Sequence, residues 1–138
     1  MAAEGHRVVL MADDDAEDCM LATEAFAESG ADAAFACVED GVELMDYLAE
    51  RSSSKSSALP DLILLDLNMP RKDGRKALVE IKSEPALRHI PIVILTTSRE
   101  ERDITLTMNA GAKSFITKPE TFDEWVRIMK SLAESWLM

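Results

Sequence analysis

Residues 61–70 read Asp-Leu-Ile-Leu-Leu-Asp-Leu-Asn-Met-Pro, and the turn pair Asp73-Gly74 follows shortly after. Four consecutive apolar residues, with turn signals on both sides, predict a strand buried on both faces, because the run is too short for a typical buried helix. Asp66 then lies at the carboxyl end of a central strand, where open α/β sheets bind their ligands. This carboxylate could be a nucleophile, a metal ligand or a helix N-cap, and the strand alone leaves all three open.

The composition is that of a soluble globular protein. The chain has 138 residues, which suits one domain, and 47% of them are hydrophobic. The net charge of −11 argues against binding to nucleic acid or to an anionic membrane surface. No apolar run approaches the ~20 residues of a membrane helix, and the start lacks a signal peptide, so we expect a cytoplasmic protein. Cys19 and Cys37 share no metal-ligand spacing, and we interpret both as reduced core residues.

Apolar runs alternate with helical patterns along the whole chain. We predict strands at 8–12, 33–38, 61–66, 91–95 and 114–117, and helices at 15–29, 40–50, 74–83, 98–110 and from 121 onward. This alternation predicts an α/β fold with a doubly wound five-stranded parallel sheet in the order 2-1-3-4-5, a flavodoxin-like (βα)5 arrangement.

Local signals set the helix starts and the loops. Asp40 is expected to cap the second helix, and the pairs Ser98/Glu101 and Thr121/Glu124 have capping-box spacing. Val42, Met45 and Leu48 or Ala49 are expected to face inward from the second helix, and Phe122 from the last. The Ser-rich residues 51–59 predict a flexible loop inside a single domain that spans residues 1–138.

Three carboxylates converge in this topology. Strands one and three flank the point where the strand order reverses, so Asp13, Asp14 and Asp66 share one crevice. Each pair about 4 Å apart repels by roughly 4 kcal/mol at an effective dielectric near 20, so the cluster needs a proton, water or a cation. Oxygen ligands suit Mg²⁺, and we predict a Mg²⁺ site with the main-chain carbonyl of Asn68 as a further ligand. An acidic helix start is an alternative explanation for Asp15 and Asp13, but it does not explain Asp66.

The other strand ends add groups that bind phosphate. Thr96 ends the fourth predicted strand with a hydroxyl, and Lys118 ends the fifth with an ammonium group. A carboxylate beside a metal ion, a hydroxyl and a lysine can accept a phosphoryl group, because the cations neutralise the transferring oxygens while Asp66 attacks phosphorus.

As a set, these motifs identify a family resemblance. The chain resembles the receiver domain of two-component response regulators from Val8 to the last helix. The matching motifs are Ala12-Asp13-Asp14-Asp15, Leu64-Leu65-Asp66-Leu67-Asn68-Met69-Pro70 with Asp73-Gly74, Ile94-Leu95-Thr96 and Ile116-Thr117-Lys118-Pro119. The Ser-rich loop, the run 91–98 and the tail 133–137 are similar to those of single-domain regulators paired with bacterial phytochromes.

The resemblance implies residue roles. Asp66 would take a phosphoryl group from a histidine kinase, here a phytochrome-type kinase by the narrower resemblance. Thr96 and Phe115 would form a switch pair, in which the hydroxyl moves to the phosphate and the ring rotates into the vacated space. The Lys118-Pro119 bond would be a candidate for the cis form, as this family tends to hold it.

Two neighbours of the switch threonine bear on access to the site. Thr97 is bulkier than the Ala or Gly common there, and with Ser98 it would tune access and the lifetime of the phosphoryl group. A surface threonine without effect is the alternative.

The sequence also predicts how the signal leaves. No output domain follows residue 138, so we expect a surface made by the fourth helix, the fifth strand and the last helix. Trp125, Trp136, Leu137 and Met138 are candidates for a docking or homodimer patch, with core burial the alternative for Trp125.

Other functional classes fit the sequence less well. A phosphatase of the haloacid dehalogenase type would need an acid two positions after the nucleophile, where this chain has Asn68. A nucleotide-binding protein would need a phosphate-binding glycine loop, and the sequence has none. A scaffold that takes no phosphate finds no support, since every acid, Thr and Lys position is filled. We therefore predict a signalling domain and not an enzyme.

Overall fold

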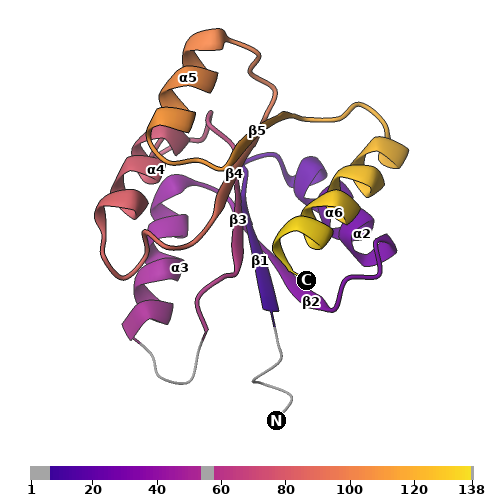
Figure 1. The fold of residues 1–138 in the computed structure, drawn as a ribbon, viewed down its shortest axis with the longest axis horizontal. Coiled ribbons are helices and arrows are strands. Elements are labelled where there is room, and N and C mark those ends of the chain that lie inside the picture. Colours follow the sequence, from indigo (N-terminus) through magenta and orange to yellow (C-terminus); the bar gives the residue numbers. More distant parts are fainter. Residues whose placement is uncertain (1–6, 54–57, 138) are drawn as a thin grey trace.

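The computed structural model describes residues 7–53 and 58–137, and within them five strands alternate with five helices. Their bounds are β1 Arg7–Ala12, α2 Ala16–Glu28, β2 Ala33–Val38, α3 Gly41–Ser53, β3 Leu62–Leu65, α4 Gly74–Ser83, β4 Ile92–Thr96, α5 Glu101–Asn109, β5 Ser114–Thr117 and α6 Phe122–Trp136. All strand pairs are parallel, and the order is β2-β1-β3-β4-β5, so the predicted topology is confirmed (Figure 1).

Helices cover both faces of the sheet. In Figure 1, α3, α4 and α5 lie on one side and α2 and α6 on the other. One apolar cluster joins β1, β3 and β4 to α3 and α4, and a second joins the same strands to α2 and α6. The three central strands are therefore buried on both faces, which explains their continuous apolar runs. None of the helices in the described ranges combines the length and apolarity that a bilayer-spanning segment requires.

The end of α3 lies later in the chain than predicted. Residues 51–53 belong to α3 and not to the Ser-rich loop, of which residues 54–57 lie outside the described part of the chain. The Arg51 guanidinium lies 4.3 Å from the centre of the Tyr47 ring, one turn back, and this contact favours the longer helix.

The predicted capping box at Ser98 is wrong. The Ser98 oxygen accepts the N–H of Glu100 at 3.3 Å and its hydroxyl donates to Asp103 Oδ2 at 2.7 Å, whereas α5 begins at Glu101 without a side-chain cap. The capping interaction at Thr121 is confirmed, because its Oγ1 accepts the Glu124 N–H at 3.2 Å.

Some burial predictions also need correction. Of the residues predicted to face inward from α3, Leu48 is fully buried and Met45 packs against the core, whereas Val42 is only partly buried, and Leu44 is the further buried residue of this face. Phe122, the first residue of α6, is 39% exposed. Cys37 is exposed on the edge strand β2 and is not a core residue.

The tail is packed and does not form the predicted exposed patch. Trp125 is 2% exposed and Leu137 is 8% exposed, both within the cluster under α2 and α6. Trp136 packs against the same cluster and is half-buried. Met138 lies outside the described residues.

Candidate functional site

Adjacent strand ends bring three carboxylates together. Asp13 follows β1 and Asp66 follows β3, and these strands pair in register with Ala12 opposite Leu65. The Asp66 N–H donates to the Ala12 carbonyl at 3.0 Å, which fixes the two strand ends side by side. One oxygen from each of Asp13, Asp14 and Asp66 lies within 4.8 Å of the others. Asp13 and Asp66 are buried and Asp14 is exposed, so the cluster opens to solvent on one side.

Lys118 places its ammonium group inside this acidic cluster. Its Nζ lies 2.7 Å from Asp13 Oδ2 and 3.2 Å from Asp66 Oδ2. Its backbone N–H donates to the Thr96 carbonyl at 2.8 Å, so the ends of β4 and β5 hold the residue in place. The Lys118-Pro119 bond is trans, which corrects the expectation of a cis bond. The trans form is also the ordinary preference of an X-Pro bond.

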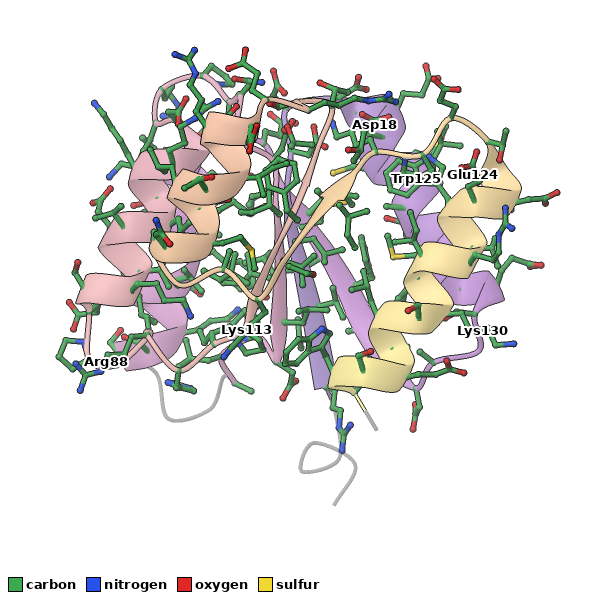
Figure 2. The ribbon with its side chains drawn as sticks, turned by 45° about the horizontal axis from the view of Figure 1, so that its top comes forward. Asp18, Arg88, Lys113, Glu124, Trp125 and Lys130 are labelled. Atoms are coloured by element: carbon green, nitrogen blue, oxygen red, sulfur yellow. The ribbon has the colours of Figure 1, made fainter. Side chains whose placement is uncertain are left out.

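Asp18 is a fourth carboxylate that the sequence analysis missed. It lies in the first turn of α2, and its Oδ2 is 2.8 Å from Lys118 Nζ, across 100 positions of sequence. Figure 2 shows Asp18 at the end of α2 that lies beside the carboxyl edge of the sheet. An acidic residue in the first turn of a helix is ordinary, because the helix dipole favours it there. The local sequence pattern therefore gave no sign that Asp18 contacts Lys118.

Burial changes the protonation of this cluster. Burial raises the pKa of Asp13 to about 6, against the lowering effect of its contact with Lys118. Burial would lower the pKa of Lys118, but its contacts with Asp13 and Asp18 outweigh burial and raise the pKa above its usual value. Lys118 is therefore a permanent cation at neutral pH, whereas Asp13 exchanges its proton near physiological pH.

The chain around Asp66 requires a glycine. The Leu67 N–H donates to Asp66 Oδ1 at 2.8 Å, and the Gly74 N–H donates to the Leu67 carbonyl at 2.9 Å. A Cβ at Gly74 would lie 2.1 Å from the Asp66 carbonyl oxygen. The turn after β3 thus folds back so closely that only glycine fits at this position.

The predicted switch residues lie on the neighbouring strands. Thr96 is fully buried at the end of β4, and its Oγ1 is 3.5 Å from the Ser98 N–H. Phe115 pairs in register with Ile94 and packs against the cluster beneath α3 and α4. Thr97 is exposed and lines a hollow of about 240 Å³ together with Lys118.

A second ion pair secures the loop after Thr96. Arg75 Nε and Nη2 donate to the two oxygens of Asp103 at 2.8 and 2.9 Å, and Asp103 is 5% exposed. Asp103 also accepts the Ser98 hydroxyl, so α4, α5 and this loop meet at one carboxylate. The sequence analysis missed this contact as well, because no motif links residues that are 28 positions apart.

The acidic cluster fits a hard divalent cation. Its side-chain ligands are all carboxylates, and a single ammonium group, that of Lys118, lies 2.7 Å from Asp13 and 3.2 Å from Asp66. One positive charge does not neutralise three carboxylates, and a divalent cation with oxygen ligands removes the remaining repulsion.

Comparisons with known proteins agree with this geometry. The family model of the response regulator receiver domain matches residues 9–130. Response regulator Rcp1 of Synechocystis sp. is 34% identical over 131 residues, covering 95% of this chain and 89% of the relative.

Solved structures are equally similar. The Mn²⁺-bound form of Rcp1 has a TM-score of 0.84 at 34% identity, covering 95% of this chain and 94% of that one. A phosphorylated cyanobacterial phytochrome response regulator, RcpA, has a TM-score of 0.86 at 40% identity, covering 96% and 94% of the two chains. With the sheet order, the acidic cluster and the lysine in place, this chain belongs to the response regulator receiver domain family.

Proposed function

We propose that this receiver takes a phosphoryl group from a histidine kinase onto Asp66. The observation that carries the proposal is the environment of Asp66, a buried carboxylate at the end of β3 with an ammonium group 3.2 Å away and two further acids beside it. Such a carboxylate is held rigidly next to positive charge, which a nucleophile toward phosphorus requires.

The chain's own residues perform most of the transfer. A carboxylate oxygen of Asp66 attacks phosphorus, and the bond from phosphorus to the kinase histidine nitrogen breaks. The ring keeps that electron pair, and with a proton on one ring nitrogen it leaves as neutral imidazole. Lys118 neutralises the phosphoryl oxygens, and Thr96 offers its hydroxyl to them. We assign the metal as Mg²⁺, held by Asp13, Asp14, Asp66 and the main-chain carbonyl of Asn68, and it would add positive charge at the same oxygens.

We assign the switch to Thr96 and Phe115. Phosphorylation adds negative charge beside a fully buried hydroxyl, and a move of Thr96 toward it would free space for the partly buried Phe115 ring. Among the described residues the Thr96 hydroxyl accepts a long contact of 3.5 Å from the Ser98 nitrogen, which is a weak hydrogen bond. The changed surface would be that of α5, β5 and α6, with Thr97 and Ser98 tuning access.

The partner and the setting are also proposals. Two similar proteins, RcpA and the bacteriophytochrome response regulator RtBRR, are named for phytochrome signalling, which supports a phytochrome-type kinase. We propose that this receiver domain acts as a cytoplasmic signalling module that is not an enzyme and binds neither nucleic acid nor membrane, in keeping with the net charge of −11. A homodimer through the same face would use the exposed apolar side chains Ile104, Leu106 and Met108 of α5, since the tail residues are packed inward.

Intact mass after incubation with acetyl phosphate tests the central proposal. We expect a Mg²⁺-dependent gain of one phosphoryl mass, and no gain for Asp66→Asn. The Asp61→Asn variant is a matched control, because Asp61 precedes β3, is exposed and should leave the gain unchanged. If neither acetyl phosphate nor a beryllofluoride complex reacts at Asp66, the scaffold alternative replaces this function.

A further inference from the structure

Two cysteines on different elements face each other. Cys19 lies in α2 and Cys37 in β2, and both are free thiols. The Cys37 Sγ is 4.0 Å from the Cys19 carbonyl oxygen, so the Cys37 thiol lies directly against the backbone of Cys19. Cys37 is two residues after Phe35, so both side chains leave β2 on the face that α2 and α6 cover.

Neither thiol is a sealed core residue. Cys37 is exposed and Cys19 is partly buried, so solutes can reach the sulfur of Cys37. The function proposed above uses neither side chain. The fold therefore places two oxidisable thiols next to each other, one exposed on β2 and one partly buried in α2.

We propose that Cys19 and Cys37 are a redox modification site, at which a hydroperoxide converts the pair into an intramolecular disulfide between α2 and β2. The Cys37 sulfur attacks the terminal peroxide oxygen, the O–O bond breaks, and the leaving oxygen takes up the thiol proton, so that a sulfenic acid and an alcohol (water, for hydrogen peroxide) result. The Cys19 sulfur then attacks the sulfenic sulfur, the S–O bond breaks, and the hydroxide leaves as water with the Cys19 proton. Both thiols are oxidised, the peroxide takes their two electrons, and a thiol reductant reverses the reaction.

The local environment decides which sulfur attacks first. The hydrogen bond from Cys19 lowers the pKa of the Cys37 thiol below its ordinary value, against the effect of burial, and Thr23 adds to the lowering. The same contact, together with burial, raises the pKa of Cys19. Cys37 is thus both the more exposed and the more easily ionised thiol, and Cys19 is the resolving one.

The pair is also next to the elements that carry the acidic cluster. Asp18, which contacts Lys118, immediately precedes Cys19, and the carbonyl of Val38, which follows Cys37, accepts the Asp13 N–H at 3.0 Å. A bond that joins α2 to β2 here would shift the first turn of α2, and with it Asp18. Oxidation would then change how strongly the cluster holds a cation.

Peroxide treatment of the dilute, reduced protein tests the disulfide. We expect a loss of about 2 Da without dimer formation, reversed by dithiothreitol. Cleavage after glutamate separates the two cysteines into peptides 18–24 and 29–39, which should be found joined. Cys19→Ser and Cys37→Ser must each abolish the loss, and oxidation in urea must be much slower, because the fold brings the sulfurs together. Cross-linking between chains, a sulfinic acid on Cys37 beside free Cys19, or equal rates in urea would each overturn the proposal.

Mn²⁺ binding tests the link to the cluster. We expect the dissociation constant of the oxidised protein to differ from that of the reduced protein by about fivefold or more. The Cys19→Ser/Cys37→Ser double variant, exposed to the same peroxide, should show no change. Equal Mn²⁺ affinities of the oxidised and reduced wild-type protein would refute this link, whatever the first experiment finds.

Discussion

Replacing Asp13 with asparagine should stabilise the metal-free protein, and more at neutral than at acid pH. Asp13 is 1% exposed, and burial raises its pKa from 3.8 to about 6. The folded state therefore binds the proton more tightly than the unfolded state, and ionisation of Asp13 destabilises the fold as pH rises through this range. Asparagine has a similar shape and carries no charge at any pH, so the variant escapes that cost.

The size of the effect follows from the shift in pKa. Between about pH 4.5 and about pH 7.5, the difference in proton binding integrates to roughly 2 kcal/mol of unfolding free energy. The cluster opens to solvent near the exposed Asp14, and solvent screens the charges there. The value of roughly 2 kcal/mol is therefore an upper limit for the change in unfolding free energy. The free energy gained by Asp13→Asn should thus be larger at the higher pH by up to about 2 kcal/mol.

Urea unfolding with a metal chelator measures this difference. Wild type, Asp13→Asn and the control Asp14→Asn are compared at both pH values. Asp14 is the exposed neighbour in the same cluster, so its removal should change the pH dependence much less. Saturating Mn²⁺ should then stabilise wild type more than Asp13→Asn, because a ligand is missing in the variant. An Asp13→Asn gain that is equal at both pH values, or larger at acid pH, would refute the argument from burial.

Three further predictions follow from the same contacts. Mn²⁺ affinity, measured by titration calorimetry, should be constant above about pH 6 and fall by up to about tenfold per pH unit below it, since a proton on the raised-pKa carboxylate competes with the ion; unchanged affinity at acid pH would contradict this. Arg75→Met should cost about 3 kcal/mol in urea unfolding because it leaves Asp103 buried without its cation, whereas Arg102→Met, which breaks an exposed pair, should cost less than about 1 kcal/mol; equal costs would show that burial does not matter here. Gly74→Ala should lower thermal stability, by more than about 2 kcal/mol, and slow phosphorylation, because the new methyl group displaces the Asp66 backbone; a variant with wild-type stability and phosphorylation would refute the clash.

The positions of the site residues at the strand ends were predictable because the topology of a parallel sheet determines them. In a parallel sheet the residues after successive strands share one edge, so Asp13, Asp66, Thr96 and Lys118 could be placed together from strand limits alone. Continuous apolar runs marked β1, β3 and β4 for the same reason, since central strands are covered on both faces.

Contacts between helices and strand ends could not be predicted in the same way. Asp18 reaches Lys118 only because of how α2 docks on the sheet, and an acidic first turn fits any helix. Ser98 and Glu101 have the spacing of a capping box, but the Ser98 hydroxyl donates to the buried Asp103 and its oxygen accepts the N–H of Glu100, which precedes the helix. These contacts depend on tertiary packing, which a local spacing rule does not include.

Charge explains why metal binding and phosphorylation should depend on each other here. When all are ionised, the four carboxylates around one ammonium leave the cluster with a net charge of about −3, and a divalent cation reduces this to about −1. A phosphoryl group on Asp66 replaces one negative charge by about two. Without the cation, phosphorylation would add charge to a site that already holds one carboxylate with a raised pKa. Lys118 can offset only one of these charges, so we expect phosphorylation to be much less favourable without the divalent cation.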